Sequence, residues 1–218
     1  MSEQRQEFDN QLEAIESKVI ELFAMVAEGL PVATQALING DDAAYLTLAE
    51  RDRVIDALYV EVEGLVNQEI LLQAPVASDL RFLLSVLRIV PELERSHDLV
   101  VHISAGAAHI IGGDLTPRAK ALVARMGDLA AQMWRQAADA WYQRDRGAAA
   151  AVAERDEGLD ELHASLIAEL ASGQLAVPVA MEMASIARDY ERLGAHAVNI
   201  ARRVVYLAGS APQKPEGS

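Results

Sequence analysis

Acidic residues spaced four apart are the residues in this sequence whose types and positions could do chemistry. Three such pairs are Asp52 with Asp56, Glu94 with Asp98, and Asp156 with Asp160. Side chains four apart lie one above the other on a helix, so each pair presents two carboxylates on one face. Carboxylate oxygens suit hard cations such as Mg²⁺, Ca²⁺ or Mn²⁺, and they also bind Fe³⁺. Where two pairs meet, the pattern predicts a site for a divalent metal or iron.

Spacing alone does not identify a site, because a chain this acidic contains such pairs by chance. Three further pairs have the same spacing and are typical of solvated helix faces: Glu3/Glu7, Asp9/Glu13 and Glu157/Glu161. An internal repeat distinguishes two of the first three pairs. Residues 50–56, ERDRVID, recur as ERDEGLD at 154–160, and each copy precedes a segment that carries Leu-Glu-Arg (93–95) or Tyr-Glu-Arg (190–192). Equivalent positions in two halves favour a shared role for these carboxylates.

The elements that must position these residues are helices. The chain has 13 glycines and 7 prolines, and no segment shows the apolar-polar alternation of a strand. Proline, glycine and capping residues divide it into six predicted helices, at 8–38, 41–73, 75–111, 117–144, 145–171 and 178–207. Short connections favour antiparallel neighbours. We therefore predict an all-α fold of two tandem antiparallel three-helix bundles, residues 1–112 and 113–208, followed by a disordered tail at 209–218.

Charge and composition argue against several classes of protein. The chain has 218 residues, a formal net charge of -14 and no cysteine. The lack of thiols removes thiolate metal sites, disulfides and cysteine nucleophiles, and it is usual in the cytosol, where we expect this protein. The acidic balance argues against nucleic-acid binding. The polar first residues do not resemble a secretory signal, and the apolar stretch 99–113 is too short to span a bilayer, so we expect membrane contact only through partners.

Three segments resemble the PhoU family, the accessory proteins of phosphate-specific transport systems. They are QAPVASDLR at 73–81, Leu-Glu-Arg at 93–95, and YERLGAHAVNIA at 190–201. The resemblance covers nearly the whole chain. It implies a pair of three-helix bundles, whose (Asp/Glu)-x-x-x-Asp motifs bind metal in some members of the family. The implied first metal site is Asp52, Asp56, Glu94 and Asp98, and the second is Asp156, Asp160 and Glu191.

By the same resemblance, the protein is expected to be a non-enzymatic negative regulator of phosphate uptake and of the two-component phosphate-starvation response. The partners that the resemblance implies are the ATPase subunit of the phosphate ABC transporter and a phosphate-sensing histidine kinase. We also expect a homodimer. The motifs of nucleotide hydrolysis, acyl transfer and zinc peptidases, GxxxxGK[ST], GxSxG and HExxH, are absent from the sequence, which gives those activities no support.

Two residues affect the metal affinity and the geometry that we expect at the implied sites. Ala195 stands four residues after Glu191, where the family pattern calls for a carboxylate, so we expect weaker metal binding at the second site. His196 is about 100° further round the helix and does not replace that carboxylate. In the first half, Pro91 removes one backbone hydrogen bond a turn before Glu94, and we expect it to kink the helix there.

Two alternatives to a metal-binding regulator remain open. Glu94-x-x-His97 and Asp160-x-x-His163 have the spacing found in ferritin-like di-metal carboxylate oxidases and metal-storage proteins. The other alternative is a plain helical scaffold, in which the carboxylates are merely solvated or are neutralised by neighbouring arginines as ion pairs without metal. The arginines concerned are Arg51, Arg95, Arg155 and Arg192.

Other notable residues have ordinary structural interpretations. Asp98 and His102 are spaced to share an intrahelical hydrogen bond rather than a metal ion. The Arg202-Arg203 pair is expected to complement the negative end of the last helix dipole. Trp134 and Trp141 lie seven apart, hence on one helix face, and we expect both to pack in the core.

Overall fold

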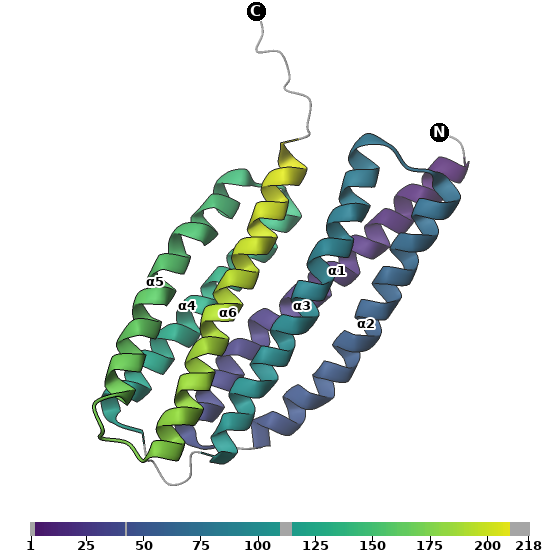
Figure 1. Ribbon diagram of the computed structural model, residues 1–218. Helices are drawn as coiled ribbons and strands as arrows, with labels where there is room; N and C mark the ends of the chain where they lie inside the picture. Colours follow the sequence, from purple (N-terminus) through teal and green to yellow (C-terminus); the bar gives the residue numbers. More distant parts are fainter. Residues whose placement is uncertain (1–2, 42, 110–114, 210–218) are drawn as a thin grey trace, which may run out of the picture.

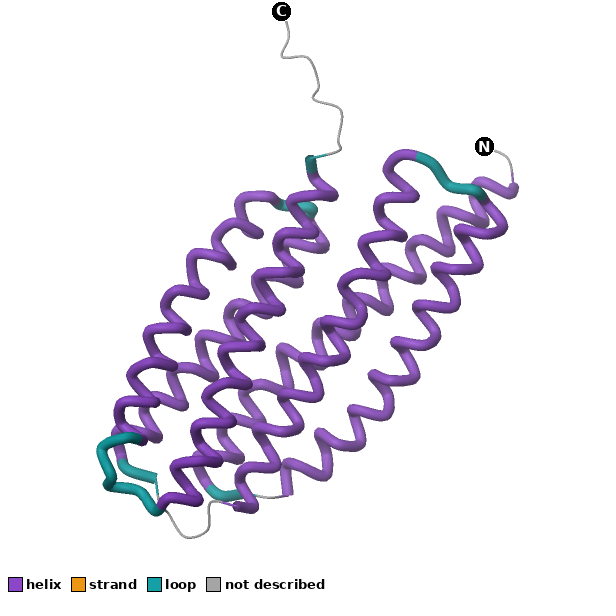
Figure 2. Tube along the Cα trace, viewed as in Figure 1, coloured by secondary structure: helices purple, strands orange, loops and turns teal. Residues whose placement is uncertain are grey.

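Six α-helices build the computed structural model, which describes residues 3–41, 43–109 and 115–209 (Figure 1). In chain order they are α1 (Glu3–Asn39), α2 (Ala43–Gln73), α3 (Ala77–His109), α4 (Pro117–Gln143), α5 (Arg146–Leu170) and α6 (Val177–Ala208). The described residues contain no strand, and the helices are joined by short connections (Figure 2). The predicted all-α fold class is therefore confirmed.

The helices pack as two sets of three. Among the described residues, α2 packs only against α1 and α3, and α5 packs only against α4 and α6. The two sets meet where α1 packs on α4 and α3 packs on α6, so α2 and α5 lie at the two outer edges (Figure 1). The predicted boundary at 112/113 and the predicted tail beyond residue 209 lie outside the described residues.

Capping residues start α4 and α5 where the sequence predicts them. Thr116 Oγ1 accepts a hydrogen bond from the Ala119 N–H at 3.0 Å. Asp145 Oδ1 accepts one from the Gly147 N–H at 2.7 Å. Each bond satisfies a backbone donor that has no partner inside its helix, so these side chains fix where the two helices begin.

The start of α3 differs from the prediction. Pro75 does not open the helix but lies in the turn between α2 and α3, and α3 begins at Ala77. Ala74 and Ala77 take left-handed φ angles of 44° and 51°, which reverse the chain direction over these few residues. Further along, α3 continues as one helix through Pro91.

Aromatic side chains connect the two sets of helices. Trp134 and Trp141 of α4 have no exposed surface, so their predicted core packing is confirmed. The Trp134 ring lies 6.2 Å from that of Phe23 in α1, and the Trp141 ring lies 6.1 Å from that of Phe82 in α3. Trp134 Nε1 also donates to the Leu193 carbonyl of α6 at 3.2 Å. The two tryptophans thus tie α4 to three neighbouring helices.

A buried hydrogen bond joins α1 to α6 where α4 comes close. Thr34 Oγ1 donates to the Leu30 carbonyl at 2.8 Å, and the Tyr190 hydroxyl lies 2.7 Å from the same oxygen. Since the threonine proton is already used, the tyrosine is the donor. A Cβ at Gly127 of α4 would lie only 2.3 Å from Thr34 Oγ1, so glycine is required opposite this bond.

One helix, α1, is long and apolar enough to cross a membrane by length and composition. The apolar stretch at 99–109 does not pass the same test in the described residues. More than half of the most apolar window of α1 is buried inside the fold. The buried side chains include Val19, Leu22, Phe23 and Val26, which recur at the spacing of one helix face. Packing against α2, α3 and α4 therefore accounts for the apolar character of α1.

Candidate functional site

The first predicted cluster lies between α2 and α3. Asp52 and Asp56 come from α2, and Glu94 and Asp98 come from α3. Burial raises the pKa of Glu94, and the nearby negative charges of Asp98, Asp56 and Asp52 raise it further, although Arg95 opposes them. Burial likewise raises the pKa of Asp98, with Asp52 and Asp56 adding to the effect and His97 opposing it. The four carboxylates are thus close enough to repel one another, as the pattern predicted.

A buried histidine positions one of these carboxylates. His97 has no exposed surface, and its Nδ1 lies 3.0 Å from Asp52 Oδ1. Because an ionised carboxylate only accepts, the ring N–H is the donor. The other ring nitrogen, Nε2, is buried without a hydrogen-bond partner. The hydrogen bond of His97 Nδ1 therefore holds Asp52 in place across the interface between α2 and α3.

The carboxylate oxygens of the first cluster suit a hard cation, but the side chains are not arranged around a single ion position. Carboxylate oxygens are the ligands that such ions take, and the mutual repulsion would be relieved by positive charge. Within the described residues, however, no three His, Asp or Glu side chains come together closely enough to hold one ion. Binding would require side chains of the cluster to come closer together than they lie in this structure.

The second predicted cluster lies between α5 and α6. Burial raises the pKa of Asp156, and Asp160 and Glu191 raise it further, whereas the positive charge of Arg202 opposes them. Glu191 also faces His163, whose Nε2 lies 3.8 Å from Glu191 Oε2. The structure thus brings all three predicted carboxylates into one neighbourhood, with two cationic or potentially cationic side chains beside them.

Position 194 is where the second cluster departs most from the first. A Cβ at Gly194 would lie 2.6 Å from Asp156 Oδ1, so the missing side chain makes room for that carboxylate. Ala195 is exposed and supplies no ligand. His196 turns away from the cluster toward α3, as its helix position predicts. Sequence reasoning did not single out Gly194, although the internal repeat aligns it with His97.

The arginines that follow or precede the carboxylates do not neutralise them as ion pairs. Arg51 lies 3.9 Å from Glu28, and Arg95 lies 3.1 Å from Glu92. Arg155 donates to two glutamine side chains of α4. In the part of the chain that the structure describes, no ion pair joins any of the four predicted arginines to a cluster carboxylate. The ion-pair alternative is therefore wrong for these contacts.

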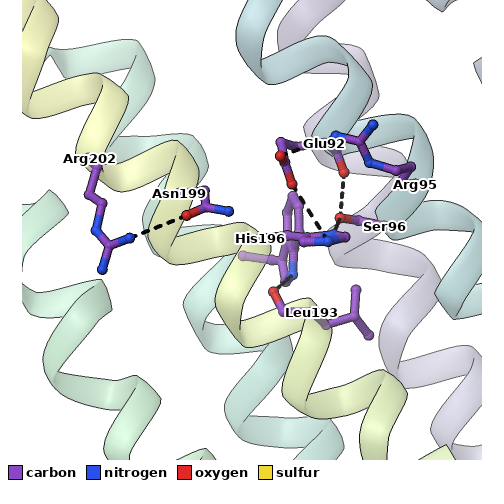
Figure 3. A network of polar contacts seen from close by, with 8 residues as sticks. Glu92, Arg95, Ser96, Leu193, His196, Asn199 and Arg202 are labelled. Carbon is purple, nitrogen blue, oxygen red and sulfur yellow. Dashed lines mark hydrogen bonds and ion pairs between the residues drawn. The ribbon is translucent and has the colours of Figure 1, made fainter.

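A polar seam joins α3 to α6, and Figure 3 shows the part of it around His196. Ser96 donates to the Glu92 carbonyl at 2.5 Å, so the His196 ring, at 2.8 Å, donates to Ser96 Oγ through Nδ1. His196 Nε2 lies 3.6 Å from Glu92 Oε2. Burial lowers the pKa of His196, and Arg95 and Arg192 lower it further, while Glu92 opposes them. This seam lies between the two sets of helices, away from both predicted metal sites.

A second histidine contact crosses the same seam and corrects one prediction. His102 does not bond to Asp98 within α3. Its Nδ1 bonds instead to Asp189 Oδ2 of α6, a carboxylate whose pKa burial raises while His102 lowers it. The partner lies on another helix because the rotation of α3 turns His102 toward α6. Spacing within one helix could not reveal this pairing.

The di-metal alternative has no support in this geometry. His97 belongs to α3 and His163 to α5, and these helices are not among the pairs that pack against each other in the described residues. A di-metal core of the ferritin type needs both Glu-x-x-His motifs to face one centre. Here each histidine contacts a carboxylate of its own half, Asp52 or Glu191.

The fold and its acidic clusters define a class: a tandem helical-bundle protein with carboxylates between the last two helices of each half. A family model described as the PhoU domain matches residues 6–106 and 123–204. The chain therefore belongs to the PhoU family, as the sequence resemblance indicated.

Relatives and solved structures agree along nearly the whole chain. A phosphate-specific transport system accessory protein PhoU homolog from Zymomonas mobilis is 30% identical over 213 residues, 96% of this chain and 89% of that protein. PhoU homolog 1 from Mycobacterium leprae is 30% identical and covers 96% of both chains. The crystal structure of PhoU from Pseudomonas aeruginosa aligns with a TM-score of 0.86 at 27% identity, over 92% of this chain and 98% of that one. PhoU from Streptococcus pneumoniae aligns at 0.83 and 26% identity, over 92% and 96%.

Proposed function

We propose that this protein is a non-enzymatic, cytoplasmic accessory protein that represses phosphate uptake and the phosphate-starvation response. The observation that carries the proposal is the match of both halves to the PhoU domain, together with relatives named as accessory proteins of phosphate-specific transport. Its proposed partners are the ATPase subunit of the phosphate ABC transporter and a phosphate-sensing histidine kinase. Contact with the membrane would be indirect, through these partners.

Surface features support a role in protein contacts. The chain carries a net charge of -14, so its surface complements basic partner surfaces. Apolar side chains are also exposed where α2 turns into α3: Leu71 is 83% exposed and Val76 73%. Exposed apolar groups of this kind mark interaction sites in many proteins. They suit either a transporter subunit or the second copy of this chain in the homodimer that we propose.

We further propose that the first cluster binds a divalent metal or iron through Asp52, Asp56, Glu94 and Asp98. A bound cation would supply positive charge that relieves the carboxylate repulsion and bridges α2 to α3. His97 would keep Asp52 oriented toward the ion. The second cluster, Asp156, Asp160 and Glu191, is proposed as the weaker site, since it has one carboxylate fewer and Arg202 beside it.

The regulatory role is tested by deleting the gene and measuring phosphate uptake and starvation-gene expression in phosphate-replete cells. We expect uptake and expression to rise and to return to normal when the wild-type gene is restored. Unchanged uptake and unchanged expression would contradict the role. Affinity purification of the tagged full-length chain from the same cells tests the partners, and absence of both the ATPase subunit and the kinase would contradict them.

The metal proposal is tested separately on purified protein. Asp52→Ala combined with Glu94→Ala should abolish metal binding at the first cluster, measured by elemental analysis and by titration with Mn²⁺ and Fe³⁺. Glu157→Ala combined with Glu161→Ala is the matched control, because that pair has the same spacing and is exposed on α5. Equal metal content in the two double variants would show that the first-cluster assignment is wrong.

A further inference from the structure

A hollow of about 290 Å³ opens between α3 and α6, beside the histidine seam. Arg88 and Glu92 of α3 line one side, and Asn199, Arg202 and Arg203 of α6 line the other. At about 30 Å³ per water molecule, its volume is on the order of ten waters, which is room for a small anion with part of its hydration shell. Arginine residues from both sets of helices therefore border one small space in a chain that is otherwise strongly acidic.

Among the described residues, Arg88 and Arg203 have no carboxylate partner, whereas Arg202 lies close enough to Asp156 to lower the pKa of that carboxyl group. Within the described residues, none of the three makes an ion pair. Arg202 Nη1 donates only to Asn199 Oδ1, at 3.4 Å, as Figure 3 shows. The Arg203 guanidinium lies 4.8 Å from the centre of the Tyr206 ring. Most of the donors that Arg88 and Arg203 carry thus remain free for a ligand.

The helix dipole does not explain the two arginines of α6, which corrects the sequence prediction. The last turn of α6 contains no basic residue, and Arg202 and Arg203 lie before it. The dipole effect fades within that turn, so it cannot account for a pair of cations that also faces Arg88 across the hollow. Like charges gathered without a counter-ion repel one another, and an anion between them would remove that cost.

Glu92 narrows the choice of anion. Arg95 donates to Glu92 Oε1 at 3.1 Å, whereas Glu92 Oε2 is buried without a hydrogen-bond partner, so one oxygen of this carboxylate can still accept a proton donor. Beside the hollow it disfavours a fully ionised oxyanion, but it can accept a hydrogen bond from an anion that still carries a proton. Phosphate groups are partly protonated near neutral pH, whereas sulfate is not.

We infer that this hollow between α3 and α6 is a phosphate site, which takes inorganic phosphate or the phosphoryl group of a small phosphate monoester. Arg88 would donate from the first set of helices and Arg203 from the second, so the bound anion would bridge the two sets. The inference goes beyond the proposed transport role and does not depend on it, because phosphate binding is measured on the purified chain alone.

The test is calorimetric titration of the purified, full-length chain with inorganic phosphate, glycerol phosphate and sulfate in chloride buffer. We expect phosphate to bind more tightly than sulfate. Arg88→Ala and Arg203→Ala should each weaken phosphate binding about tenfold or more, because each removes a charge-assisted donor pair. Arg188→Ala is the control, since Arg188 is an exposed arginine of α6 outside the hollow.

Each outcome decides the inference. Tighter binding of glycerol phosphate would assign the site to a phosphorylated metabolite, and tighter binding of inorganic phosphate would assign it to the free ion. Absence of phosphate binding, sulfate binding as tight as phosphate binding, or equal weakening in the Arg188→Ala control would overturn it. Circular dichroism and melting temperature of every variant separate loss of the site from loss of the fold.

Discussion

The two acidic clusters occupy equivalent places in the two halves, yet they are built differently at one helix position. Three residues after the glutamate, the first half has His97 and the second has Gly194. His97 reaches Asp52 at 3.0 Å, whereas a Cβ at Gly194 would lie 2.6 Å from the equivalent Asp156. A side chain holds the aspartate in one half, and the lack of a side chain makes space for it in the other.

The charge balance of the clusters differs as well. In the first, four carboxylates face each other, and Arg95 only partly offsets the effect on Glu94. In the second, three carboxylates are accompanied by Arg202 and by His163. Duplicated sequence therefore does not mean duplicated function: the first cluster concentrates negative charge, and the second carries part of its own compensation.

The largest expected effect comes from removing the histidine that distinguishes the first half. His97→Leu keeps an apolar group of similar size but deletes the donor to Asp52, so we expect metal affinity at the first cluster to fall about 10–100-fold. Urea unfolding should show little loss of stability, because the change also removes a buried nitrogen that has no partner. Metal titration checks the affinity. Unchanged affinity would mean that His97 does not position Asp52 for metal.

Filling the space at the equivalent position should break the second cluster. Gly194→Ala places a Cβ 2.6 Å from both Asp156 Oδ1 and Leu159 Cδ2, and we expect a loss of about 1–3 kcal/mol in the free energy of unfolding. Gly64→Ala in α2 is the matched control, since nothing lies within 4 Å of its Cβ. That control should stabilise the protein by about 0.5–1 kcal/mol. The same sign for both variants would contradict the close packing at Gly194.

Restoring the missing carboxylate should make the second cluster more like the first. Ala195→Asp adds an acidic side chain one turn after Glu191, and we expect metal affinity there to rise about tenfold, or ~1.4 kcal/mol. Ala195 is exposed, so the change should not disturb the core. Titration of the variant in a background that carries Asp52→Ala and Glu94→Ala isolates the second cluster. No gain in affinity would show that geometry, rather than ligand number, limits this site.

The smallest expected effect is on the free energy of unfolding of the metal-free protein. The folded state raises the pKa of Glu94 and Asp98 above their unfolded values, so it binds these protons more tightly than the unfolded chain does. Their contribution to stability is therefore full below about pH 4 and is lost as the pH rises through the folded-state pKa values. Asp98→Asn should stabilise the metal-free protein at neutral pH by a few tenths of a kcal/mol. Urea unfolding with EDTA at several pH values should show this gain shrinking toward acid pH. A gain that grows toward acid pH would contradict the raised pKa values of Glu94 and Asp98.

Helix positions and several local contacts could be predicted from the sequence. Proline, glycine and capping residues act within a few positions along the chain, so the sequence predicts the helix starts at Thr116 and Asp145. The burial of both tryptophans followed from their spacing and apolar surface. The internal repeat also indicated which carboxylates would gather between neighbouring helices.

Contacts between helices could not be predicted from the sequence. The bonds of His102 to Asp189 and of His196 to Ser96 depend on how α3 and α6 are rotated and shifted against each other. Packing across the whole interface sets that rotation, and the spacing along one helix contains no information about it. For the same reason the hollow between Arg88 and Arg203 appears only when the two helices are placed side by side.

The bond between Thr34 and Tyr190 has a consequence for how the chain is made. Thr34 leaves the ribosome long before Tyr190, so a nascent first bundle must wait with its α4-facing side uncovered, including Phe23, until the second half is synthesised. During that interval the growing polypeptide exposes apolar surface, which makes it prone to aggregation until synthesis of the second half is complete.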